Sequence, residues 1–371
     1  MNVLIICRVV DHFGDAGVCL RLARGLAARS NRVDLLIDRP ELILAMCPSL
    51  RLGERVDGIR LMDWSDSAVA ELVGTFLHAE ATDGLSVLEG APHSVDAMVE
   101  QPFDAGPRAL LIETFHHEAP EPLRALFEAL PGAARVMLDY LATEPWADSM
   151  QGMSAVDRYF PVPQRHWWAP SFSKGLLLGD PAQLKRMLVG ECSVERPASD
   201  VFWVLGFGYA DAPWTAFENA VKNHGLPDGF SRMQIHTPSG IERSQDEFDS
   251  LLCSTNLNFV RGEDSFVRAH WAAASSRCVP FVWQPYRQAN CAHADKLGGW
   301  MDQVLVGDAL EPLRRLHLAF NRLGMQTETE VSNAWRDCVS SWPEIRQTLA
   351  ERSRGLVQWD LLDSICRDLS L

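Results

Sequence analysis

The chain has 371 residues, of which 47% are hydrophobic and 22% charged, so it is long enough for two domains with packed cores. Its formal net charge of -15 argues against nucleic acid or an anionic membrane as the main partner. Nine scattered cysteines without a CxxC pair, and no apolar run of about 18 residues, favour a reduced protein without membrane spans. We therefore expect a cytoplasmic globular protein.

Apolar segments and helical periodicity alternate through the first half of the chain. Residues 2–10 (NVLIICRVV) form a continuous apolar run, which predicts a strand buried on both faces. Residues 17–30 predict a helix and residues 32–38 a second strand, the βαβ opening of a doubly wound α/β domain. This helix has apolar residues on one face and basic residues between them: Val18, Leu22, Leu26 and Arg21, Arg24, Arg29. Further strands are expected at 59–64, 108–115 and 134–138.

A second set of strands and helices follows a segment without periodicity. Residues 150–175 are rich in Pro, Ser and aromatic residues, and we interpret them as an interdomain connection with Trp167 and Trp168 in its core. One or two amphipathic helices are expected over 341–371. Strands are expected at 200–208, 230–238, 254–262 and 278–286, with a helix at 212–225 closed by Gly225.

These patterns predict two α/β domains, which we place at 1–172 and 173–349, with residues 350–371 packing back on the first domain. In parallel sheets, ligands bind at the carboxyl ends of the strands, where helix N-termini point at them. The architecture therefore predicts an anionic ligand in a cleft between the domains.

Two carboxylates, Asp11 and Asp15, lie around Gly14 where the first strand gives way to a helix. Gly14 lets the backbone turn sharply or approach a ligand closely. Asp15 is suited to cap a helix that begins near Gly17, but no capping role is evident for Asp11. The pair is thus open to both a structural and a functional interpretation.

A second acidic motif lies in residues 256–272 (NLNFVRGEDSFVRAHWA), again after an apolar run that ends at a glycine. Glu263, Asp264 and Ser265 begin the next helix, where carboxylates complement the helix dipole. The backbone N–H groups of 264 and 265 and the Ser265 hydroxyl also form a phosphate cradle, with Arg261 beside them. A carboxylate next to a phosphate cradle is unusual for a purely structural loop.

Together the two motifs predict a cleft in which Asp11, Asp15 and Glu263 face a diphosphate-bearing donor, as in two-domain nucleotide-sugar transferases. The G-x-x-x-x-G-K-[ST] loop and the G-x-G-x-x-G fingerprint are both absent, which disfavours P-loop and dinucleotide enzymes. No Cys/His cluster has zinc-like spacing, so we expect no metal site and assign the three candidate ligands to the surface or the core: His116, His117 and His293.

The chain resembles the bacterial elongation factor P arginine rhamnosyltransferases in VVDHFGDAGVCLRLARGLA, FVRGEDSFVRAHWA and PFVWQPYRQ, with weaker matches in LLIETF, LDYLATEPW and DEFDSLL. The resemblance implies the GT-B fold, in which two Rossmann-like domains face each other across a cleft. It also implies inverting, metal-independent transfer of L-rhamnose from dTDP-β-L-rhamnose to one arginine of elongation factor P, with no cofactor.

The same resemblance implies roles for individual residues. Asp15 matches the proposed general base, and Asp11 and Glu263 match the other two acids of the catalytic group. The substrate-binding positions that match, in addition to Gly14, are Phe207, Tyr209 and Gln245 for the nucleotide, and Arg261, Asp264 and Ser265 for the diphosphate. The sequence departs from the family where His12 replaces the usual Asn and where Ile241 and Glu242 replace a Pro-Phe element.

The chemistry explains why several acids are needed. A guanidinium stays protonated and its lone pairs are delocalised, so it is a poor nucleophile. One carboxylate can hold and orient it while another accepts its proton. Two alternatives remain: a GT-B transferase or epimerase that acts on a carbohydrate, and a non-catalytic protein that binds elongation factor P.

Overall fold

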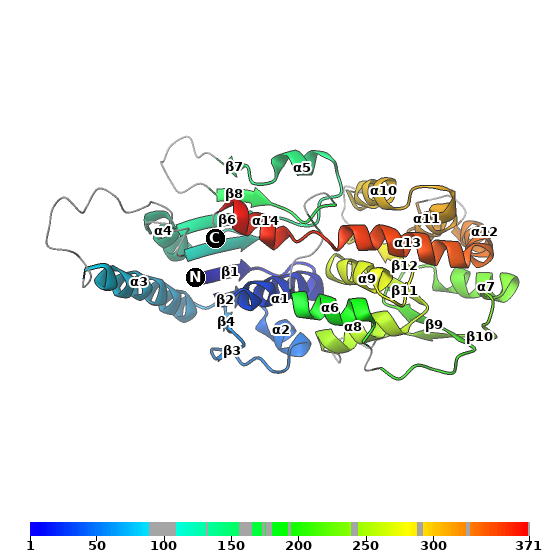
Figure 1. The fold of residues 1–371 in the computed structure, drawn as a ribbon, viewed down its shortest axis with the longest axis horizontal. Helices are drawn as coiled ribbons and strands as arrows, with labels where there is room; N and C mark the ends of the chain where they lie inside the picture. The colour runs from blue at the N-terminus through cyan, green and yellow to red at the C-terminus, as the bar shows by residue number, and fades with distance from the viewer. Residues whose placement is uncertain are drawn as a thin grey trace.

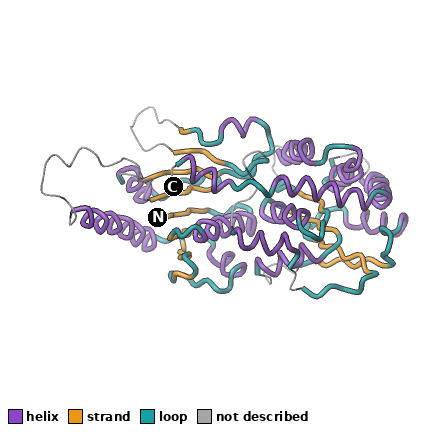
Figure 2. Tube along the Cα trace, in the orientation of Figure 1, coloured by secondary structure: helices purple, strands orange, loops and turns teal. Residues whose placement is uncertain are grey.

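The computed structural model describes residues 1–88, 109–130, 133–155, 165–172, 175, 180–191, 194–238, 244–287, 292–323 and 327–369. Within these residues the chain forms two β-sheets, each with its own helices, that follow one another along the long axis of the molecule (Figure 1). The Cα trace shows the same separation of the strands into two groups (Figure 2). The α/β class and the two Rossmann-like halves predicted from the sequence are confirmed.

The first sheet has eight described strands in the order β3-β4-β2-β1-β5-β6-β8-β7. Strand β1 lies at the centre and pairs in parallel with β2 and β5. The short edge strands β3 and β7 run antiparallel to their neighbours. The strands are β1 (Asn2–Cys7), β2 (Arg32–Ile37), β3 (Arg55–Val56), β4 (Ile59–Asp63), β5 (Ala109–Thr114), β6 (Ala133–Leu138), β7 (Ser154–Ala155) and β8 (Arg165–Trp168).

Helices cover both faces of this sheet, and strand β1 shows why. Val3 and Ile5 pack into one hydrophobic core with α1 and α2, whereas Leu4 and Ile6 pack into another with α3 and α4. Because successive side chains of a strand point to opposite faces, a continuous apolar run requires a cover on each side. The helices of this half are α1 (His12–Ala28), α2 (Pro40–Met46), α3 (Asp66–Leu88), α4 (Glu121–Ala129) and α5 (Trp146–Met150).

Two expectations for the first half are wrong. Helix α1 begins at His12, not near Gly17. The segment 150–175 is not only a connection, because β8 pairs in parallel with β6 and extends the sheet. Strand β8 has only four residues, too few to show a period in the sequence. Its last residue, Trp168, is buried in the first domain's core. Trp167 donates a hydrogen bond to Asp139 through its ring nitrogen.

The second sheet consists of four described strands in the order β10-β9-β11-β12, all parallel. All four were predicted, as was the helix closed by Gly225, whose φ is +77°. The strands are β9 (Val201–Gly206), β10 (Arg232–His236), β11 (Leu257–Arg261) and β12 (Phe281–Gln284). The helices are α6 (Pro181–Val189), α7 (Trp214–His224), α8 (Gln245–Ser254), α9 (Asp264–Ala274), α10 (Ala292–Val304), the 3₁₀ helix Asp308–Leu310, α11 (Glu311–Phe320), α12 (Thr327–Ser340) and α13 (Trp342–Leu356).

The chain returns to the first sheet at its end. Helix α13 packs in the second domain's core, whereas α14 (Leu361–Asp368) buries Leu361, Leu362 and Ile365 in a core of the first domain. Figure 1 shows this passage, with both chain ends beside the first sheet. The domain boundary placed after residue 172 falls between β8 and α6, and it stays a prediction.

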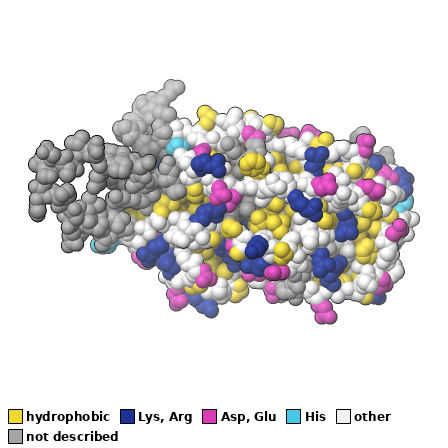
Figure 3. Space-filling model, viewed as in Figure 1, with side chains coloured by type: hydrophobic (Ala, Val, Ile, Leu, Met, Phe, Trp, Pro, Cys, Tyr) yellow, Lys and Arg dark blue, Asp and Glu magenta, His cyan; other side chains and the backbone are white. Residues whose placement is uncertain are grey.

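The surface carries both signs of charge. On the face drawn in Figure 3, acidic and basic side chains are interspersed, with hydrophobic atoms between them. Among the described helices, none is both long and apolar enough to cross a membrane.

Candidate active site

Loops at the carboxyl ends of strands in both sheets meet around one cavity of about 300 Å³. The first domain contributes the loop after β1, the start of α1 and the residues after β5 and β6. The second domain contributes the start of α9, the end of β12 and the start of α10. The lining residues are Val10, Asp11, Gly14, Asp15, Val18, Phe115, His117, Tyr140, Glu263, Trp283, Tyr286, His293 and Lys296. The structure therefore brings the three predicted acids and Gly14 into one interdomain cleft.

Asp15 lies in the first turn of α1, and it is not the N-cap that a helix from Gly17 would require. Its Oδ2 atom accepts the backbone N–H groups of Val10 (2.7 Å) and Asp11 (2.8 Å). Tyr140 also hydrogen-bonds to this carboxylate. Burial raises the pKa of Asp15, while these hydrogen bonds oppose that shift. The side chain is thus buried in the cavity wall and held there by three hydrogen bonds.

Asp11 occupies the N-cap position of α1, but its side chain makes no capping hydrogen bond. Its carboxylate lies in a slot between two glycines. A Cβ atom on Gly14 would lie 2.5 Å from Asp11 Oδ2, and one on Gly262 would lie 2.9 Å from the same atom. Burial, followed by the charges of Asp15 and Glu263, raises the pKa of Asp11 to about 7, while Arg261 opposes the shift.

Gly14→Ala is expected to lower activity about tenfold or more with a small change in stability, because the added methyl group displaces the Asp11 carboxylate. The φ angle of Gly14 is not in the left-handed region, so alanine suits the backbone there. Gly74→Ala is the matched control, since nothing lies within 4 Å of its Cβ position in helix α3. Steady-state kinetics and thermal denaturation of both variants test this, and equal activities would contradict it.

Glu263 links the two domains across the cavity. It occupies the N-cap position of α9, as predicted. Its Oε2 accepts the backbone N–H of Leu141 from the first domain (2.8 Å), and its Oε1 pairs with Lys296 Nζ (2.5 Å). Both side chains are mostly buried, so the contact is shielded from water. Glu263 is the one acid of the three that carries a cationic partner at this distance within the described part of the chain.

Sequence reasoning missed several residues of the cavity. Lys296 lies in the first turns of α10, and the Phe115 and Tyr140 rings stack at 4.4 Å with 13° between their planes. Burial, followed by the charge of Asp15, raises the pKa of Tyr140, so its hydroxyl stays protonated and able to donate. For the two aromatic residues the signal was their position after β5 and β6, at the carboxyl ends of these strands.

A second cluster lies beside the three acids. The guanidinium of Arg261 stacks over the rings of Phe207 (4.8 Å) and Tyr209 (5.2 Å). The Tyr209 N–H donates to Gln284 Oε1 (3.1 Å), which fixes this loop against β12. Three predicted donor-binding residues therefore come together next to Asp11, whose charge contributes to the raised pKa of Tyr209.

The other predicted donor-binding side chains are engaged elsewhere. The Ser265 hydroxyl donates to the carbonyl of Arg261 (2.5 Å). The backbone N–H of Ser265 lies in the first turn of α9, where N–H groups have no partner within the helix, so it can bind an anion. The Asp264 carboxylate pairs with Arg21 (3.1 Å) and Arg268 (2.9 Å), away from the cavity. The structure does not bring Gln245 to the cavity: it is buried in the domain interface, where its Oε1 accepts Arg24 (2.9 Å).

Arg21 contacts the second domain. It lies among the basic positions of α1, but only 1% of its side chain is exposed, because it faces Asp264 of the second domain. Val18, Leu22 and Leu26 are buried as predicted. The polar face of α1 is therefore a contact between the domains.

His12 is the first residue of α1 and has a φ of +35°. Asparagine tolerates positive φ well, so the Asn that usually stands here in the resembled family suits this backbone. His117 and His293 are partly buried and line the cavity. No group of three or more potential metal ligands occurs among the described residues. Ile241 and Glu242 lie outside the described residues.

The family model described as "Elongation-Factor P (EF-P) rhamnosyltransferase EarP" matches residues 3–81 and 232–367, more than half of the chain. The chain belongs to the EarP family. The matched regions include all three acids of the cavity and the α9 terminus. The resemblance seen in the sequence is thereby confirmed.

Similar proteins carry the name protein-arginine rhamnosyltransferase. One from Pseudomonas aeruginosa is 27% identical over 92% of each chain, and one from Pseudomonas putida is 26% identical over 92% of this chain and 91% of its own. One similar solved structure concerns the structural basis for EarP-mediated arginine glycosylation of translation elongation factor EF-P. The alignment covers 99% of this chain and 97% of that one, at 20% identity and a TM-score of 0.38.

Proposed function

We propose that this EarP-family protein transfers L-rhamnose from dTDP-β-L-rhamnose to an arginine side chain of elongation factor P, with inversion and without a metal ion. The observation that carries the proposal is the convergence of Asp11, Asp15 and Glu263, from two domains, on one cavity. The names of the family and of its curated relatives support the same reaction.

The three acids suit a cationic acceptor. Without a ligand, burial and then the charges of Asp15 and Glu263 raise the pKa of Asp11 to about 7. A guanidinium between them would relieve that repulsion and keep the carboxylates ionised. Asp11 and Glu263 then hold and orient the acceptor nitrogen, and Asp15 accepts its proton as the bond to the sugar forms.

The donor side suits a diphosphate leaving group. Arg261 and the N-terminal N–H groups of α9 lie in the second domain, opposite Asp15 of the first domain. Cationic and amide donors at this position stabilise the negative charge that grows on the diphosphate, as a metal ion does in other transferases. A base on one side and a leaving group on the other is the arrangement that attack with inversion requires.

The carbohydrate alternative fits this cavity less well. A neutral sugar hydroxyl gains little from three carboxylates, and it leaves their repulsion unrelieved. The alternative of a non-catalytic binder of elongation factor P makes a different prediction, since it needs no base at Asp15.

The direct test is intact-mass spectrometry of purified elongation factor P after incubation with the protein and dTDP-β-L-rhamnose. The expected result is a gain of one deoxyhexose, unchanged by EDTA, and no gain with a UDP-hexose as donor. A reaction that EDTA abolishes would contradict the metal independence. An unchanged acceptor mass, with both proteins folded, would overturn the proposed transfer.

The pH dependence of acceptor capture follows from Asp11. Its carboxyl must be ionised to hold the guanidinium, and its pKa in the free protein is about 7. We expect kcat/KM for elongation factor P to rise with pH through about 7 and then to level off, since kcat/KM reports groups of the free enzyme. Asp11→Asn is expected to remove this inflection from the remaining activity. If the inflection in kcat/KM stays at the same pH in Asp11→Asn, the titrating group is not Asp11.

The Asp11 carboxyl also affects folding: it makes the free protein less stable as the pH rises, whereas it makes acceptor capture more efficient. Its folded pKa is raised from 3.8 to about 7, so its favourable contribution is complete below 3.8 and is lost as the pH rises through about 7.

A further inference from the structure

A second cavity lies in the second domain, at the amino ends of its strands. It has a volume of about 560 Å³. Its lining comes from the loops that precede β9, β10, β11 and β12 and from helix α13. The active-site cleft lies at the carboxyl ends of the same sheet, and a six-residue strand such as β9 spans about 20 Å. The two cavities therefore lie at opposite ends of the strands of this sheet.

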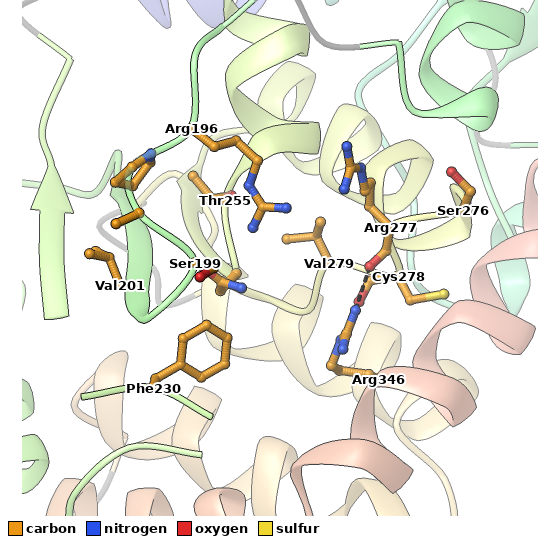
Figure 4. Close-up of a pocket in the computed structure, with 13 residues that line it drawn as sticks. Arg196, Ser199, Val201, Phe230, Thr255, Ser276, Arg277, Cys278, Val279 and Arg346 are labelled. Atoms are coloured by element: carbon orange, nitrogen blue, oxygen red, sulfur yellow. Dashed lines mark hydrogen bonds between the residues drawn. The ribbon is translucent and has the colours of Figure 1, made fainter. Parts of the chain in front are cut away.

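Three arginines surround this second cavity. Figure 4 shows Arg196 reaching from one side toward Val279, with Arg277 and Arg346 on the other side. No aspartate or glutamate occurs among the described lining residues. Three cationic side chains around one cavity stand out in a chain whose net charge is -15. The electrostatic potential of the cavity favours an anion.

The arginines differ in how they are held. Arg346 donates from Nη2 to the carbonyl of Arg277 (2.7 Å) and from Nε to that of Cys278 (3.2 Å), which fixes the turn that carries Arg277. The guanidinium of Arg277 has no hydrogen bond or ion pair to any described residue. The neighbouring acid Asp200 is engaged by the Ser231 hydroxyl (2.6 Å) and by Arg232 (3.6 Å).

The remaining lining residues suggest the kind of anion. The Ser199 hydroxyl and the Asn256 side-chain amide can add hydrogen bonds to oxyanions. Phe230 and Val279 provide an apolar wall, and the volume exceeds what a single phosphate fills. Guanidinium groups bind phosphate oxygens in a bidentate manner, with charge assistance.

We propose that this cavity binds a small phosphorylated molecule, with its phosphate among Arg196, Arg277 and Arg346 and its organic part against Phe230 and Val279. The site is separate from the sugar-transfer cleft, and its ligand is not consumed by the transfer reaction. It would allow the second domain to respond to a metabolite while the donor is bound.

Isothermal titration calorimetry with inorganic pyrophosphate tests the proposal without any activity measurement. We expect pyrophosphate to bind this cavity in the wild type, which can also take it up at the cleft, and to bind it as a single site in Arg261→Ala, which disables the cleft's phosphate-binding arginine. Arg196→Ala and Arg277→Ala are each expected to weaken binding about tenfold, because each removes a charge-assisted contact. The control Arg336→Ala, an exposed arginine on α12, should bind as the wild type does.

Other outcomes would overturn the proposal. Absence of pyrophosphate binding by the wild type would do so. Loss of binding in Arg261→Ala, with binding retained in Arg277→Ala, would place the anion in the active-site cleft instead. Circular dichroism of each variant establishes that it is folded, so that a loss of binding reports on the cavity.

Discussion

Asp15→Asn is expected to lower kcat for sugar transfer by about a hundredfold to ten-thousandfold, the range that a general base contributes. Asparagine keeps an oxygen that can accept the N–H groups of Val10 and Asp11, so the start of α1 stays in place. The variant loses the ability to take a proton from the acceptor. Donor affinity, measured by calorimetry, should stay within about twofold of the wild type, because the donor contacts lie in the other domain.

The matched control for this variant is Asp38→Asn. Asp38 also accepts a backbone N–H, that of Val9 (2.9 Å), but it lies outside the cavity lining. It should keep nearly full activity. Comparable turnover in Asp15→Asn and Asp38→Asn would remove Asp15 from the reaction and favour a protein that only binds elongation factor P.

Arg268→Met is expected to destabilise the protein by about 3–5 kcal/mol, the cost of leaving a buried partner charge uncompensated. Arg268 is fully buried on α9, where it pairs with Asp249 and, at 2.9 Å, with Asp264. Burial raises the pKa of Asp249 to about 6 even with this arginine present. Without it, Asp249 must take up a proton or remain an unpaired charge in the core.

Chemical denaturation measures this effect, with Arg336→Met as the control. Arg336 pairs with Asp337 on an exposed helix surface, where such a pair contributes about 0–1 kcal/mol. A double variant, Arg268→Met with Asp249→Leu, should recover part of the loss, because apolar groups can replace a buried ion pair. A single variant as stable as the control would show that the pair contributes little to folding.

The sequence predicts the fold well where burial imposes a regular pattern. Strands such as β1 and β9 are covered on both faces and therefore read as continuous apolar runs. Since ligands bind at the carboxyl ends of the strands in each sheet, and the sequence predicts two such domains around a cleft, the acids that follow β1 and β11 could be predicted to converge. Asp11, Asp15 and Glu263 occupy these positions.

Features that depend on distant contacts were not predictable from local pattern. Arg21 is one of the basic residues between the apolar positions of α1, but it is buried against Asp264, which lies in the other domain. The slot around the Asp11 carboxylate needs Gly14 and Gly262 together, although they are far apart in the chain. Lys296 pairs with Glu263 only because α10 folds back over the cavity.

The measurement that tests the central claim most directly is tandem mass spectrometry of elongation factor P after incubation with the protein and dTDP-β-L-rhamnose. It locates the added sugar on a single side chain. If the three acids hold and deprotonate a guanidinium, the deoxyhexose will lie on an arginine, and an acceptor with lysine at that position will not be modified. A deoxyhexose on a hydroxyl or amide side chain, or on the lysine variant, would contradict the account.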